Sequence, residues 1–164
     1  DNLGPSIKKG YDTAVNKFSK DLLKIVLFSI ATGTPPKGTG INWEPHSPIT
    51  TKKYGEHPIY YLTGTYYRAI GLFKYKDRTL VGLPRSKGRS SSGGITLGEL
   101  ARILEYGTGG RGGGKSSGTI PPRPLWNPAI NAVGGKDRLR SMIIKNIRKQ
   151  LYGFGIRANQ VRWR

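Results

Sequence analysis

The chain has 164 residues, with 28 Lys and Arg against 9 Asp and Glu, a formal net charge of +19 and no cysteine. This length suits one domain that buries about two-thirds of its unfolded surface, and the lack of cysteine excludes disulfides, thiolate catalysis and Cys-based zinc sites. Because such an excess of positive charge dominates long-range encounters with polyanions, nucleic acid is the first partner to consider, against the alternative that the charge only keeps the protein soluble.

The N-terminal part predicts one long helix over residues 6–31. Ser6 is a suitable N-cap, and apolar residues then recur at spacings of three and four. The recurring residues are Ile7, Tyr11, Val15, Phe18, Leu22 and Ile25. Residues 22–28 are apolar nearly all round, which predicts burial on several sides. The most apolar run is too short for a membrane span and contains Lys24, so we expect no membrane partner and, without a secretion signal, no export.

The middle of the chain predicts a long connection followed by a hairpin. Residues 34–58 contain five prolines and no sustained period, so we expect an extended surface loop that Trp43 and Tyr54 pin down. Residues 62–70 predict a short helix or turn. Residues 71–75 and 79–83 then face one another across a polar turn, as two strands of a hairpin do.

The second half predicts loops alternating with helices. Residues 84–94 and the glycine-rich stretch 108–119 are expected to be flexible loops. Between them, Thr96 and Glu99 have the spacing of a capping box for a short helix that ends at Gly107. Asn127 with Pro128 is a suitable N-cap and first turn for the last helical region.

The last helical region is expected to run to Tyr152, with the glycines 134 and 135 able to break it before Asp137 restarts it. One face is apolar and comprises Leu139, Met142, Ile143, Ile147 and Leu151. The opposite face is basic and comprises Arg138, Lys145, Arg148 and Lys149, with Arg140 as an exception within the apolar arc. We therefore predict a single α+β domain over residues 1–152, in which a small antiparallel sheet is flanked by a long N-terminal helix and a C-terminal helix. Residues 153–164 form a basic arm that orders on a partner.

Residues 109–116 match the phosphate-binding pattern of glycine, four residues, glycine, lysine and serine. That chemistry requires a buried strand before the loop and a helix after it, whereas here a predicted helix precedes the loop and Pro121 follows it. We therefore reject a nucleotide site. The nine acids form no apparent catalytic pair, although their spacing alone leaves a metal-dependent nuclease open. His46 and His57, near Glu44 and Glu56, are the one candidate metal site, which we do not favour; we predict no enzyme and no cofactor.

Three pieces of sequence carry a family resemblance. Residues 104–108 read Leu-Glu-Tyr-Gly-Thr, and Pro-Pro-Arg-Pro follows at 121–124 before Pro128 and Ala129. Upstream lie Trp43-Glu-Pro, with Thr-Thr-Lys-Lys at 50–53, and Leu62-Thr-Gly, with Arg68 and Ile70. In this order they resemble the phage tail-completion and virion-morphogenesis families and the related head-tail joining proteins.

The resemblance implies a structural virion protein of a tailed phage, a head-tail joining or tail-terminator subunit of the neck. It implies a homo-oligomeric ring around the DNA channel, hexameric or alternatively dodecameric. Each subunit would contact the next through two different surfaces, so that the rotation closes the ring. Other neck, connector and tail proteins would be its partners, with assembly in the host cytoplasm and a final location in the virion. The alternative function is a free basic DNA-binding protein that works off the virion.

Two sets of site residues follow. The expected interface with another subunit or partner comprises Glu105, Tyr106, Gly107, Pro122, Arg123 and Pro124. There the prolines hold the chain extended and Arg123 forks onto a carboxylate, with Glu105 as the expected partner; a corner inside one domain is the alternative. The basic surface expected to face channel DNA or acidic partners comprises Arg111, Lys115, Arg138, Lys145, Arg148 and Lys149.

Overall fold

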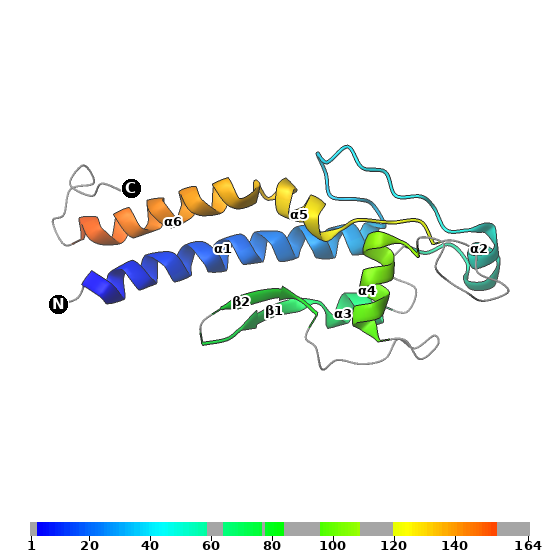
Figure 1. Cartoon of the computed structure of the whole chain (residues 1–164), viewed down its shortest axis with the longest axis horizontal. Coiled ribbons are helices and arrows are strands. Elements are labelled where there is room, and N and C mark those ends of the chain that lie inside the picture. Colours follow the sequence, from blue (N-terminus) through cyan, green and yellow to red (C-terminus); the bar gives the residue numbers. More distant parts are fainter. Residues whose placement is uncertain (1–2, 59–63, 77, 84–95, 109–119, 154–164) are drawn as a thin grey trace.

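The computed structural model describes residues 3–58, 64–76, 78–83, 96–108 and 120–153. It is a mostly helical α+β structure in which a long N-terminal helix packs on the C-terminal helix beside a two-stranded antiparallel sheet (Figure 1). The elements are α1 (Leu3–Thr32), α2 (Pro48–Tyr54), α3 (Thr65–Ala69), β1 (Gly71–Lys74), β2 (Thr79–Gly82), α4 (Leu97–Tyr106), α5 (Trp126–Ala132) and α6 (Gly135–Tyr152). This confirms the predicted α+β class, the long N-terminal helix, the two-stranded antiparallel sheet and the C-terminal helix. The C-terminal helix was expected to flank the sheet, but it packs on α1, and α2 was not predicted. Three predicted segments lie outside the described residues: the loop 84–94, nearly all of the loop 108–119, and the basic C-terminal segment after Gly153.

Helix α1 buries a stripe with a period of four. The stripe comprises Gly10, Ala14, Phe18, Leu22, Val26 and Ile30. Phe18 and Leu22 lie on the predicted face, but Ile7 and Tyr11 are exposed, contrary to expectation. Small residues face the neighbouring helix in the N-terminal half of α1, so the large apolar side chains there turn outward.

Helix α6 lies antiparallel to α1 along the N-terminal half of α1 (Figure 1). The two backbones approach closely at Gly10, where an added Cβ would lie 2.8 Å from the Cα of Ile147. Further along, Arg138 Nη2 lies 3.2 Å from Asp21 Oδ2. We call this pair, residues 3–21 of α1 with α6, the helical arm.

The hairpin of β1 and β2 packs on α1. Gly71 pairs with Gly82 and Lys74 with Thr79, and the Tyr75 amide donates to the Arg78 carbonyl at 2.8 Å across the turn. An isolated two-stranded hairpin is marginally stable in water. Its contact with α1, on a different side from α6 (Figure 1), supplies the missing packing.

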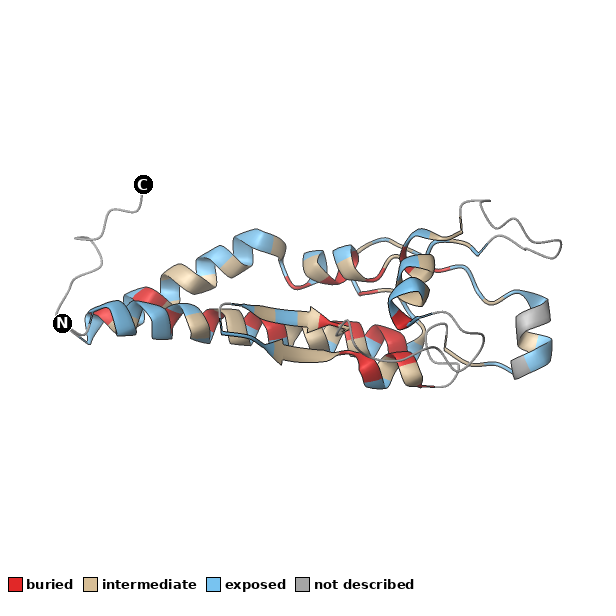
Figure 2. Ribbon diagram, turned by 60° about the horizontal axis from the view of Figure 1, so that its bottom comes forward, coloured by how far each residue is buried: buried red, intermediate tan, exposed pale blue. Residues whose placement is uncertain are grey.

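The hydrophobic core lies around the C-terminal half of α1, where buried residues gather in Figure 2. Val26 and Ile30 are fully buried there, together with Leu125, Ala129 and Val133 from and around α5. The other members are Phe18, Leu22, Trp43, Tyr66, Ala69, Ile70 and Leu97. The hydrophobic core therefore lies at one end of the molecule, and the helical arm forms the other end.

The connection from residue 33 to residue 58 is less irregular than predicted, because it contains α2. Pro48 occupies the first position of this helix, where its missing amide costs nothing. The Ser47 carbonyl accepts from the Thr51 amide at 3.0 Å. The prolines that predicted an extended loop include one that begins a helix.

Helix α4 begins as predicted. The Thr96 side chain accepts from the Glu99 amide, and Glu99 Oε2 accepts from the Thr96 amide and from the Thr96 hydroxyl. The two bonds that the carboxylate accepts lower the pKa of Glu99. Helix α6 starts at Gly135 rather than at Asp137, after Gly134 has turned the chain with φ of 94°. The predicted break between the last two helices is confirmed.

Candidate functional site: a buried corner and a basic groove

Glu105 lies in the last turn of α4 and is only 8% exposed. Its Oε2 accepts from the backbone amides of Leu125, at 2.8 Å, and Trp126, at 3.3 Å. These amides stand at the start of α5, where no residue of the same helix bonds them. Glu105 therefore caps α5 from another helix. The prediction that Asn127 caps this helix is wrong, because Asn127 lies inside its first turn.

Arg123 is 5% exposed and bonds a different segment. Its Nε donates to the Glu44 carbonyl at 2.9 Å and its Nη2 to the Pro45 carbonyl at 3.1 Å. The expected pairing with Glu105 is therefore wrong: the carboxylate is taken by backbone amides and the guanidinium by backbone carbonyls. Nearby, Trp43 Nε1 donates to the Pro124 carbonyl at 3.0 Å, so the two segments are bonded at three points.

Gly107 makes the turn between α4 and the glycine-rich loop. Its φ is 71°, and an added Cβ would lie 2.7 Å from the Ile120 carbonyl oxygen, so only glycine fits. The Thr108 amide donates to the Ile120 carbonyl at 3.1 Å, and the Ile120 amide donates to Thr108 Oγ1 at 2.9 Å. The Arg123 amide bonds the Leu104 carbonyl at 2.6 Å. The two ends of the loop are thus fastened together.

Tyr66 of α3 completes this corner and was not singled out from the sequence as a site residue. It is buried and accepts a hydrogen bond from the Trp126 side chain, and it lies close enough to Glu105 for the carboxylate charge to disfavour ionisation of the phenol. Burial, with a smaller contribution from Glu105, raises the pKa of Tyr66 above its ordinary value of 10.0. The phenol therefore stays neutral at physiological pH and acts as a hydrogen-bonding core group.

The main contacts of the corner lie within one domain. Glu105 and Arg123 bond backbone groups of the same chain and Gly107 forms a tight turn, which agrees with the alternative of an intradomain corner. Of the remaining predicted interface residues, Tyr106 is 71% exposed and Pro122 is exposed, while Pro124 is half-buried. Only Tyr106 and Pro122 thus offer a neighbour substantial surface.

The two histidines of the disfavoured metal site lie close together. The ring centroids of His46 and His57 lie 4.3 Å apart. Among the described residues, however, no group of three or more His, Asp or Glu side chains is arranged to hold a metal ion. The two rings alone give a metal ion too few protein ligands for a structural or catalytic zinc site.

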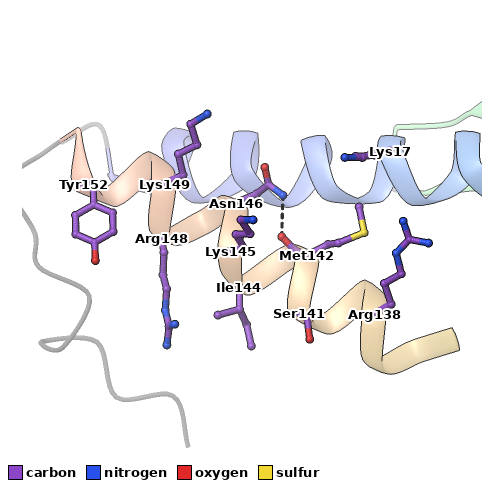
Figure 3. A pocket seen from close by; sticks show the side chains of 10 residues that line it. All are labelled: Lys17, Arg138, Ser141, Met142, Ile144, Lys145, Asn146, Arg148, Lys149 and Tyr152. Atoms are coloured by element: carbon purple, nitrogen blue, oxygen red, sulfur yellow. Dashed lines mark hydrogen bonds between the residues drawn. The ribbon is translucent and has the colours of Figure 1, made fainter. Parts of the chain in front are cut away.

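A basic groove lies along α6 (Figure 3). It encloses 990 Å³, and five cationic side chains line it without any acidic one among the described residues. The cations are Lys17 of α1 and Arg138, Lys145, Arg148 and Lys149 of α6. Met142, Ile144 and Tyr152 add apolar surface between them. The four predicted basic residues of α6 therefore do line one surface, whereas Arg111 and Lys115 lie outside the described residues.

The groove cations differ in how far they are neutralised. Arg138 bonds the Val133 carbonyl at 2.8 Å and forms the ion pair with Asp21, so part of its charge is balanced. Lys145, Arg148 and Lys149 are exposed and form no ion pair with the described residues. These three side chains are available to an external anion.

Comparison with protein-family models, with curated proteins and with solved structures finds no match to this chain. Within the described part of the chain, none of the helices combines the length and the apolar character that crossing a bilayer requires.

Proposed function

We propose that this chain is a structural subunit of the neck of a tailed phage, where copies form a ring that completes the tail or joins it to the head. In that ring the basic groove of the helical arm faces the phosphates of the DNA in the channel. The observation that carries the proposal is the groove itself, with five cations and no acidic residue among the described residues that line it.

The pattern of charge favours contact with phosphates over reading of bases. The groove cations repeat along one side of an 18-residue helix, which is about 27 Å long. Lysine and arginine ends on long, exposed stems bind phosphate without sequence preference. Dispersed contacts of this kind suit a channel, because DNA must pass through it without being gripped.

The protein has too few acids to neutralise this surface fully from a neighbouring copy, and three of them are already engaged. Asp12 pairs with Lys8 at 2.6 Å and Asp21 with Arg138, while Glu105 is buried in its cap. Helices α1 and α6 together carry eleven Lys and Arg residues against Asp12, Asp21 and Asp137. Copies of the arm repel one another, so we expect an outside polyanion to neutralise it.

The corner supports the ring part of the proposal. The pieces that resemble neck proteins meet there through Glu105, Arg123 and Trp43. Their hydrogen bonds hold the backbone of the corner in one conformation, and Tyr106 is exposed next to it. A rigid backbone with an exposed aromatic side chain suits a contact that must repeat with the same geometry around a ring.

The DNA contact is tested by salt-dependent binding. In fluorescence anisotropy with a labelled 30-bp duplex, we expect changing Lys145, Arg148 and Lys149 to Gln to weaken binding. The slope of log affinity against log salt should fall in magnitude by up to about 2.7, because each phosphate that is no longer neutralised lowers it by about 0.9. The matched control changes the exposed Lys37, Lys52 and Lys76, outside the groove, to Gln. Equal decreases in both triple variants would show that only the total charge matters and would overturn the groove assignment.

The ring is tested separately by particle shape and mass. Negative-stain images and sedimentation of the protein mixed with DNA and with neck or tail components should show closed rings. If the protein stays monomeric in every mixture yet binds DNA tightly, the free DNA-binding protein is correct and the neck assignment is wrong.

A further inference from the structure

Two histidines, one before and one after α2 in the sequence, lie against one another within the connection of residues 33–58. The rings of His46 and His57 are inclined by 55° at a centroid distance of 4.3 Å. The Nε2 atoms of both rings are buried and have no hydrogen-bond partner among the described residues. With Glu56 and Thr51 they line a pocket of 580 Å³ against the C-terminal end of α1.

The tautomer of His57 follows from its contact. Its Nδ1 lies 3.0 Å from the Pro58 carbonyl, which can only accept, so Nδ1 carries the hydrogen. In the neutral ring Nε2 therefore has a lone pair, on a buried atom without a hydrogen-bond partner within the described part of the chain. The Nε2 atom of His46 is buried in the same way, so protonation of His46 leaves a hydrogen on an atom that has no acceptor among the described residues. A buried donor without a partner is unfavourable.

The electrostatic surroundings also oppose protonation. Arg123 bonds the carbonyls of Glu44 and Pro45, immediately before His46. Burial, the proximity of His57 and the charge of Arg123, in that order, lower the pKa of His46 below 6.5. A hydrogen bond with the backbone of Pro58 acts in the opposite sense without outweighing them. Glu56 is the one carboxylate that lines the pocket among the described residues.

We propose that His46, packed against the ring of His57, forms an acid-sensitive latch, which holds residues 44–58 on the corner while His46 is neutral and releases them when His46 is protonated. Protonation of His46 would place a second cation near the Arg123 guanidinium that fastens the same segment. Moving the His46 ring into water then lowers the free energy, and this favours the released segment. This inference does not depend on the proposed function.

The direction of the pH dependence follows from linkage. Because the held state has the lower pKa, the released state takes up protons first, and the latch is intact above pH 6.5 and weakens as pH falls below it. Because His46 binds a proton more readily on release, the ratio of released to held segment rises by up to about tenfold per pH unit.

Hydrogen exchange tests the latch in the full chain. Between pH 7 and pH 5.5, after correction for the intrinsic rate, amide exchange in residues 44–58 should rise several-fold, to at most about tenfold, and exchange in α6 should not. A variant with His46→Gln and His57→Gln should stay within about twofold. Equal pH dependence in both proteins, or loss of α6 protection together with the segment, would overturn the proposal.

A second measurement keeps the test valid even if glutamine fits the pocket poorly. NMR titration of the imidazoles in the unchanged protein should give His46 a midpoint below 6.5, and the opening of residues 44–58 should follow that midpoint. A His46 midpoint at or above 6.5 would overturn the proposal, because the held state would then not disfavour protonation of that ring.

Discussion

Replacing Glu105 by alanine tests the corner most directly. The change leaves the amides of Leu125 and Trp126 without their acceptor, at distances of 2.8 and 3.3 Å from the deleted oxygen. A hydrogen bond to a charged group contributes about 1.5–3 kcal/mol. Counting the short bond fully and the long one in part, we expect the free energy of unfolding to fall by about 2–4 kcal/mol.

Urea unfolding followed by circular dichroism measures this fall, and the m-value should not change. At about 2–4 °C per kcal/mol, a decrease near 3 kcal/mol lowers Tm by about 6–12 °C. Glu105→Gln keeps one neutral acceptor and should destabilise by about half as much. The control is Glu44→Ala, because the exposed Glu44 side chain bonds none of the described residues. If Glu105→Ala differs from that control by less than about 0.5 kcal/mol, the carboxylate does not cap α5 and the reasoning fails.

Three further predictions concern close packing and titration. Gly107→Ala should cost about 1–3 kcal/mol in thermal unfolding, because its φ is 71° and a Cβ meets a carbonyl oxygen, whereas Gly98→Ala, in an open helical position, should be neutral or stabilising. Gly10→Leu should separate the arm helices and lower Tm, whereas Gly4→Leu should not, since nothing lies within 4 Å of a Cβ there; equal Tm values would contradict the close helix crossing. The raised pKa of Tyr66 means that its contribution to stability is intact below pH 10 and disappears as pH rises above it, so Tyr66→Phe should flatten the alkaline fall in stability measured by urea unfolding.

Local signals predicted the elements well. The capping box at Thr96, the glycines 134 and 135, and the polar turn between the strands each act within a few residues, and all three appear where expected. The long N-terminal helix was predicted because its apolar period runs for several turns. Signals of this range depend little on the rest of the fold.

Pairings across the chain were harder to predict. A carboxylate and a guanidinium near one turn suggested a salt bridge between Glu105 and Arg123, yet each found backbone partners instead. The partners of Arg123 lie 79 and 78 residues away, and no local pattern points to them. The face of α1 was assigned by its largest apolar residues, whereas Gly10 decides it by allowing the close approach of α6.

The groove was only partly foreseeable. A helical wheel placed Lys145, Arg148 and Lys149 together, because that depends on one helix alone. Lys17 joins them only through the packing of α6 on α1. The same packing supplies Asp21, which balances one of the predicted cations.

The packing of α1 on α6 also affects how the chain is made. About a hundred residues separate the end of α1 from the start of α6, and a ribosome adds about 5–20 residues per second. The stripe of α1 that α6 covers is therefore without its partner for about 5–20 s in each round of synthesis. During that interval the stripe stays exposed to water, so a chaperone that covers α1 should improve the yield of folded protein.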